Sequence, residues 1–169
     1  MKSWGITPLY LGHVTIAKSR LTVDLDPDLV LELPYLGFLL RNGARKILID
    51  SGISENYLKG GKGWGGCLCE GGRSYVVKAL ANASVSPEEI DTVVYTHLHN
   101  EHGANSTLFR NARVIVQNDE WKTLLVPLPA MKVRRDYEPD YARELSTLKL
   151  LRVDGDFEFA LCCGRVGVA

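Results

Sequence analysis

Residues 96–103 read Thr-His-Leu-His-Asn-Glu-His-Gly and place three of the four histidines of the chain within six residues. Imidazole is the commonest protein ligand for zinc and related metals. The β-branched run 90–95 just before this segment predicts a buried strand. The histidines then follow the carboxyl end of that strand, where open α/β sheets place their sites. The segment therefore predicts a metal site formed by His97, His99, Glu101 and His102.

A lone histidine in a sequence is more often an ordinary surface or core residue than a metal ligand. Three histidines with a carboxylate between them and a glycine after them rarely arise by chance, which favours the metal site. His97 and His99 are spaced to face one metal ion, and Glu101 and His102 to face a second position. The fourth histidine, His13, has no such neighbours and is predicted to be an ordinary surface or turn residue.

The segments upstream of the histidines predict a hairpin followed by a long loop. Residues 35–41 and 46–50 read as strands, and the Asn42-Gly43 pair between them is a strong two-residue hairpin signal. The second strand ends at Asp50-Ser51-Gly52. Residues 52–72 are rich in glycine and predict a loop that is not a phosphate cradle, because no Gly-Lys-Ser/Thr pattern follows.

Further elements on both sides predict a layered α/β domain. Ser86 to Glu89 has the pattern of a capping box with proline at the first helical position. Asn118 is expected to cap a helix over 119–126. The remaining predicted elements are strands within 6–16, a loop over 19–28, a helix over 73–83, a strand over 112–117 and a strand pair within 148–159.

The composition excludes several classes of function. The 169 residues predict one domain, and the 20 basic and 20 acidic residues cancel, which gives no footprint for nucleic acid or for an anionic membrane. No apolar run is long enough for a transmembrane helix or a signal peptide, so the expected location is cytoplasmic. The cysteine pairs 67/69 and 162/163 lack the spacing of a zinc knuckle and are expected to be reduced thiols.

The histidine segment resembles the His-x-His-x-Asp-His motif of metallo-β-lactamase-fold hydrolases. Residues 47–52, which end in Asp50-Ser51-Gly52, resemble the strand of that superfamily that ends in Asp-Thr/Ser-Gly. The order of elements is similar from about residue 6 to 158. Within the superfamily, segments 7–12, 70–80 and 86–93 resemble the N-acyl-homoserine-lactonase-like branch.

This resemblance implies an αββα sandwich built of two ββα halves, of which this chain holds the first and largely lacks the second. Residues 1–159 would be the N-terminal portion of such a domain, and residues 160–169 an atypical tail. The resemblance also implies zinc, one or two ions, held by His97, His99, Glu101 and His102 with Asp50 beneath them. Glu101 would be catalytic and handle the proton, while a metal-bound hydroxide attacks the carbonyl of a lactone or ester.

Two departures from the family pattern lower the expected activity. Glu101 replaces the family's aspartate, and its extra methylene moves the carboxylate by about 1.5 Å, against a ligand tolerance of about ±0.2 Å. No histidine follows His102, so the ligands of the second half are missing. A frameshift or a mis-called gene end would produce such a chain, and a short paralogue is the alternative.

Two functions remain open at this point. The first is a metal-dependent hydrolase of lactones or esters, in a shortened form with weak or no activity. The second is a non-catalytic remnant, or a module that another chain completes, for example in a homodimer that supplies ligands in trans. A nuclease of the same superfamily has no support in the neutral charge.

Overall fold

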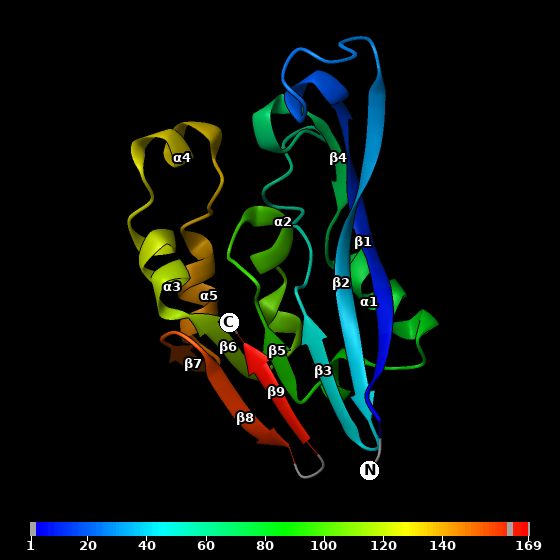
Figure 1. Ribbon diagram of the computed structural model, residues 1–169, viewed down its shortest axis with the longest axis vertical. Helices are drawn as coiled ribbons and strands as arrows, with labels where there is room; N and C mark the ends of the chain where they lie inside the picture. Colours follow the sequence, from blue (N-terminus) through cyan, green and yellow to red (C-terminus); the bar gives the residue numbers. More distant parts are fainter. Residues whose placement is uncertain (1–2, 162–163, 169) are drawn as a thin grey trace.

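The computed structural model describes residues 3–161 and 164–168, and its main feature is a seven-stranded mixed sheet (Figure 1). The strand order is β4-β1-β2-β3-β5-β6-β7, and β8 and β9 form a separate two-stranded sheet. The strands are β1 (Gly5–Ala17), β2 (Val30–Asn42), β3 (Arg45–Ile49), β4 (Leu68–Gly71), β5 (Thr92–Val94), β6 (Arg113–Gln117), β7 (Lys149–Val153), β8 (Phe157–Leu161) and β9 (Gly164–Val168). The α-helices are α1 (Arg73–Asn82), α2 (Asn100–Gly103), α3 (Asn118–Leu125), α4 (Pro129–Arg134) and α5 (Asp140–Ser146). Single 3-10 turns are η1 (Lys18–Arg20), η2 (Trp64–Gly66), η3 (Pro87–Glu89) and η4 (Ser106–Leu108).

One end of the sheet is antiparallel. The hairpin of β2 and β3 is present as predicted, and Phe38 pairs with Ile49. Its two turn residues are Gly43 and Ala44, one position later than predicted, because Asn42 still pairs with Arg45. Strand β2 begins earlier than predicted because it pairs with β1 along almost its whole length, up to Ala17 opposite Val30. The register of β1 shifts between Tyr10 and His13, which marks a bulge.

The other end of the sheet, β3-β5-β6-β7, is parallel. Its central strands are buried on both faces, which explains their continuous apolar runs. The buried apolar side chains form two clusters. Leu48, Val93 and Val114 belong to the larger core, and Ile47, Val94 and Ile115 belong to the smaller one. Because parallel strands end at one edge, the loops after β3, β5 and β6 meet there.

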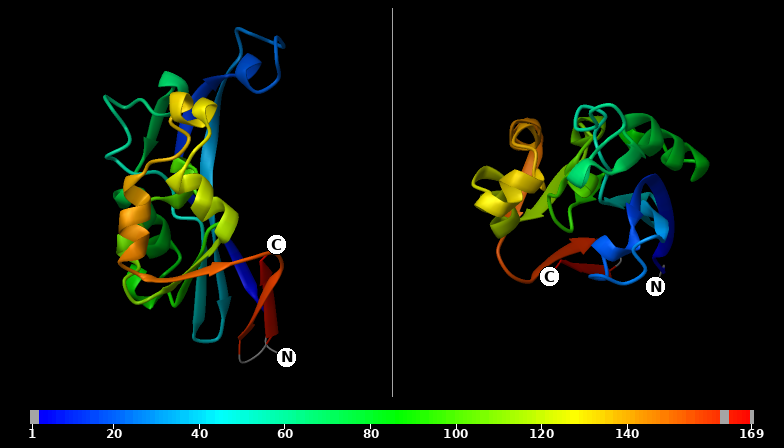
Figure 2. Two further views of the ribbon diagram at one scale, coloured as in Figure 1. Left: turned by 90° about the vertical axis from the view of Figure 1, so that its left-hand side faces the viewer. Right: turned by 90° about the horizontal axis from the view of Figure 1, so that it is seen from above.

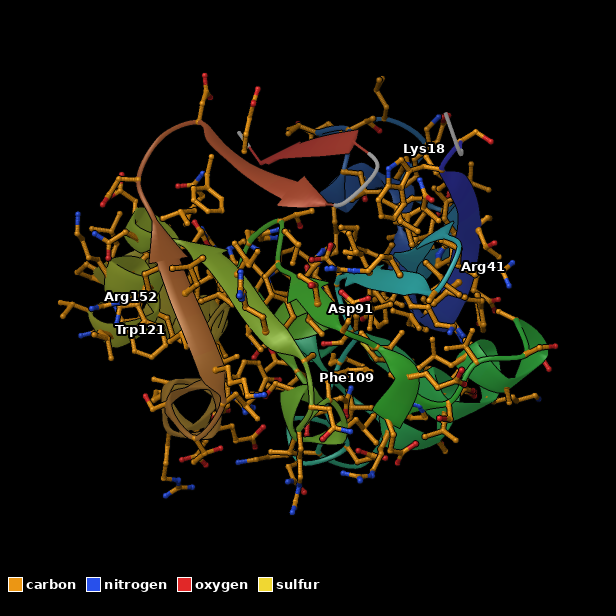
Figure 3. The ribbon with its side chains drawn as sticks, turned by 90° about the horizontal axis from the view of Figure 1, so that it is seen from below. Lys18, Arg41, Asp91, Phe109, Trp121 and Arg152 are labelled. Atoms are coloured by element: carbon orange, nitrogen blue, oxygen red, sulfur yellow. The ribbon has the colours of Figure 1, made fainter. Side chains whose placement is uncertain are left out.

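The helices and the small sheet lie on opposite faces of the large sheet (Figure 2). Helices α1, α3 and α5 cover the larger core, where Phe109 is fully buried. Arg152 of β7 lies over the ring of Trp121 of α3, with its guanidinium carbon 5.7 Å from the ring centroid (Figure 3). On the other face, Phe157 packs against the cluster of Ile47, Val94, Ile115 and Val153.

The structure corrects several predictions made from the sequence. Strand β4 and the turn η2 lie inside the predicted loop 52–72. Asn118 is the first residue of α3, and Gln117 is its N-cap. The expected strand pair within 148–159 does not exist as a pair, because β7 pairs with β6 and β8 pairs with β9. Helices α4 and α5 were not predicted.

Two other predictions concern the ends of the chain and the membrane. Strand β8 runs across the expected boundary at 159/160, and residues 162 and 163 with their cysteines lie outside the described residues. Among the described helices, none has both the length and the hydrophobicity needed to cross a bilayer.

Candidate functional site

Three imidazole rings meet beside the carboxyl ends of β3 and β5. His97 and His99 lie on the loop between β5 and α2, and His102 lies on α2. The ring centroid of His97 is 4.6 Å from that of His99 and 4.1 Å from that of His102. The first turn of α2 brings His102 back towards the loop, since its backbone N–H donates to the carbonyl oxygen of His99 at 3.0 Å.

Asp50 joins the end of β3 to the histidine segment. Its side chain is buried and accepts hydrogen bonds from the Thr96 backbone N–H at 2.9 Å, from Thr96 Oγ1 at 2.8 Å and from His102 Nδ1 at 2.9 Å. The adjacent Ser51 N–H donates to the carbonyl oxygen of His102 at 2.9 Å. The Asp-Ser-Gly motif and the histidine motif are thus docked on one another through both backbone and side chains.

These contacts determine which ring nitrogens carry hydrogens. A carboxylate only accepts, so His102 donates its Nδ1–H to Asp50, and in its neutral form keeps the lone pair of Nε2. Thr96 uses its single hydroxyl hydrogen on Asp50, so Thr96 Oγ1 accepts from His97 Nδ1, which lies 3.0 Å away. His97 therefore also keeps a free lone pair on Nε2.

The charges around the two rings differ. Burial lowers the pKa of His97, and the neighbouring His102 and His99 lower it further, which favours the neutral ring. Burial also acts to lower the pKa of His102, but its hydrogen bond to Asp50 and the charge of Asp50 outweigh burial and raise it.

Glu101 and His99 complete the cluster. The His99 ring meets the ring of Tyr137 edge-on, with centroids 4.8 Å apart. Within the described residues the carboxylate of Glu101 makes no hydrogen bond or ion pair. Burial raises the pKa of Tyr35 and of Tyr57, and the charge of Glu101 acts in the same direction on both.

A cavity of about 690 Å³ opens beside the cluster. One end is polar and includes Asp50, Thr96, His99, Glu101 and His102. The rest of the lining is mostly apolar and comes largely from β1, from β2 and from Leu21 between these two strands. Its other lining residues are Val14, Ile16, Leu21, Leu33, Pro34, Tyr35, Leu36, Phe38, Trp64, Arg134 and Asp136.

Comparison with known families agrees with this arrangement, because the model of the metallo-beta-lactamase superfamily matches residues 32–160. The chain belongs to the metallo-β-lactamase superfamily. Among curated proteins it is similar to the N-acyl homoserine lactonase of Bacillus cereus, with 24% identity over 156 residues. That match covers 87% of this chain and 58% of the lactonase. A probable metallo-hydrolase of Methanocaldococcus jannaschii is 43% identical over 37 residues, which are 22% of this chain and 18% of that protein.

Solved structures of the superfamily share the fold of this chain. An N-acyl homoserine lactone hydrolase with N-hexanoyl-L-homoserine bound at its metal centre superposes with a TM-score of 0.75 at 23% identity, covering 95% of this chain and 63% of that one. The dizinc quorum-quenching lactonase AidC gives a TM-score of 0.65 at 16% identity, covering 91% and 59%. At these identities the likeness shows the fold, and the chain spans about 58% of the length of the curated lactonases.

The superfamily implies a metal, and the site fits one in part. Imidazole and carboxylate groups are the donors that zinc prefers. However, among the described residues no group of three or more histidine, cysteine, aspartate or glutamate side chains is arranged to hold a metal ion. His97, His99, Glu101 and His102 are therefore brought together without forming a complete ligand set, and their roles as ligands stay a prediction.

Several residues around the site were not predicted. Glu120, in the first turn of α3, accepts the backbone N–H of Leu98 at 3.0 Å. Its position just after β6 was a usable signal, since neighbouring parallel strands end at the same edge. Tyr137 and Asp136 lie between α4 and α5, and no local pattern points to them.

Proposed function

We propose that this chain is part of a metal-dependent hydrolase that acts on a lactone or another ester-like carbonyl compound. The observation that carries the proposal is the cluster of three imidazoles, in which Asp50 and Thr96 leave Nε2 of His97 and His102 free. The lactonases that share the family and the fold support the class of substrate.

The cavity favours a neutral substrate with an apolar substituent. Its walls are mostly apolar, while the cluster lies at one end. A zinc ion at such a cluster supplies a Lewis acid and lowers the pKa of a bound water towards about 7. The part proposed for Glu101, besides metal binding, is to take up a proton, since its carboxylate faces the cavity.

The second candidate is a non-catalytic remnant or a module completed by a partner, such as a second copy of this chain. The absence of a complete ligand set among the described residues favours it. We expect one weakly bound zinc ion in this chain alone. The proposed location is the cytoplasm, where the free thiols of Cys67 and Cys69 stay reduced.

Zinc titration by calorimetry tests the site. The double variant His97→Ala/His99→Ala should lose all zinc uptake, because it removes two of the three imidazoles. The control is His13→Ala, which removes the one histidine outside the cluster and should bind zinc as the unchanged chain does. Equal zinc uptake in the double variant would contradict the proposed site.

Hydrolysis of N-hexanoyl homoserine lactone in the presence of zinc separates the two candidates. Clear turnover by the unchanged chain, lost in the double variant, establishes the hydrolase and excludes the remnant. Zinc binding without turnover supports a module that needs completion.

A further inference from the structure

The backbone around His99 is held on both sides from other elements. The N–H of Leu98 donates to Oε2 of Glu120 at 3.0 Å, and the N–H of Asn100 donates to the carbonyl oxygen of Asp136 at 3.1 Å. Leu98 and Asn100 are both buried. The peptide group between His97 and Leu98 is therefore tied to α3, and the peptide group after His99 is tied to the segment between α4 and α5.

The ring of His99 is held by that same segment. Tyr137 packs edge-on against it, with an angle of 79° between the ring planes, and His97 lies on another side at 4.6 Å. The Tyr137 hydroxyl donates to Oε2 of Glu120 at 3.2 Å, so one carboxylate oxygen binds both the Leu98 amide and the ring that contacts His99.

We propose that Glu120 and Tyr137 are positioning residues that set the orientation of His99. They act on His99 through a backbone amide and a ring contact, whereas Asp50 binds the His102 ring directly and Thr96 binds the His97 ring. A hydrogen bond to an ionised acceptor is about twice as strong as a neutral one, and here it fixes a buried amide. The inference rests on the proposed function only in taking His99 to be a metal ligand. The orientation of the His99 ring can be measured without metal or substrate.

An ordinary structural role is the alternative. Glu120 lies in the first turn of α3, where an acidic side chain also interacts well with the helix dipole. Under that alternative, removing the carboxylate lowers the stability of the fold and leaves the orientation of His99 unchanged. The two roles therefore differ in whether the His99 ring responds more than the other two imidazole rings.

The test is nuclear magnetic resonance of the histidine rings in the metal-free chain. In Glu120→Ala we expect the ring signals of His99 to shift and broaden, because Tyr137 loses its anchor and its ring current moves. The signals of His102 should stay nearly in place, because Asp50 holds that ring. Those of His97, whose ring lies 4.6 Å from that of His99, should shift less than those of His99, because Thr96 holds the His97 ring. Glu120→Gln keeps an acceptor oxygen and should restore the His99 signals.

The matched control is Asp119→Ala, which removes the neighbouring acidic residue of the same helical turn. It should leave all three rings unchanged. Unchanged His99 signals in a folded Glu120→Ala chain would overturn the inference, and so would an equal shift of all three histidines. If Glu120→Ala does not fold, Tyr137→Phe takes its place, since it removes only the hydroxyl bond to Glu120. A shift that is largest at His99 supports the inference, and no shift overturns it.

Cobalt binding gives a second measurement. Loss of a partner that orients a ligand typically costs about 10- to 100-fold in metal affinity, and we expect a loss of that order in Glu120→Ala but not in Asp119→Ala. If the unchanged chain binds no cobalt, the proposed function is weakened while the resonance test still decides the orientation of His99.

Discussion

Asp50 adopts a backbone conformation that an aspartate rarely takes, with φ at 58°. Such a conformation is uncommon outside glycine, although aspartate and asparagine tolerate it better than other residues. In this structure the chain turns at Asp50, at the end of β3. There the Asp50 carboxylate accepts three hydrogen bonds, two from Thr96 and one from His102. One residue in an unfavourable conformation thus fixes the tautomers of two histidines.

Thr96 can be tested apart from Asp50. In Thr96→Val we expect His97 to lose its single tautomer and become a mixture, because no oxygen accepts its Nδ1–H any longer. Thr96→Ser retains the hydroxyl and should retain the tautomer. Nitrogen chemical shifts of the ring, measured where His97 is neutral, report the change, and an unaltered His97 in Thr96→Val would contradict the hydrogen-bond assignment.

Among the elements, those fixed by neighbouring residues were predictable and those fixed by distant ones were not. The hairpin of β2 and β3, with its turn one residue later than predicted, and the capping box of Ser86 and Glu89 are both present, because each depends on residues close in sequence. Strand β4 was missed because it is short, lies in a glycine-rich stretch and exists through its pairing with β1. The histidine cluster was predictable from its spacing, whereas the contacts of Glu120 and Tyr137 depend on tertiary packing.

Gly12, at the bulge of β1, is predicted to be essential for that pairing. Its φ is 124°, and an added Cβ would lie 2.2 Å from the backbone oxygen of Glu70 on β4. Gly12→Ala should therefore cost about 1–3 kcal/mol or more of the free energy of unfolding, measured by urea denaturation. Gly5→Ala on the same strand is the control, since its Cβ would meet only the oxygen of Arg41 at 3.9 Å; equal losses in both variants would contradict the argument.

The molecule as a whole has one apolar sheet face that is only partly covered. Beyond the part packed against Phe157, this face carries side chains of β1 and β2 with large exposed fractions: Ile6 66%, Tyr10 46%, Leu36 41% and Phe38 37%. Contiguous exposed apolar surface favours association. The formal net charge of zero provides little repulsion between copies near neutral pH.

We expect the chain to self-associate near pH 7, and Ile6→Lys to reduce this association. The substitution puts a charge on this apolar surface, and Ile6 is not among the residues that line the cavity. Val133→Lys is the matched control, because Val133 is 86% exposed on α4, away from this face. Light scattering against protein concentration measures the effect, and equal reductions in both variants would show that charge alone, not the sheet face, governs association.

The change from antiparallel to parallel pairing at β3 has a consequence for the order in which the chain folds. Strands β2 and β3 are separated only by a tight turn, whereas β5, the parallel partner of β3, begins at Thr92. Pairing β3 with β5 closes a longer loop than the hairpin does, and this costs more conformational entropy before the strands make contact. Such non-local pairing therefore forms slowly. We therefore expect the antiparallel strands β1, β2 and β3 to form first, and the imidazole cluster to assemble later against them.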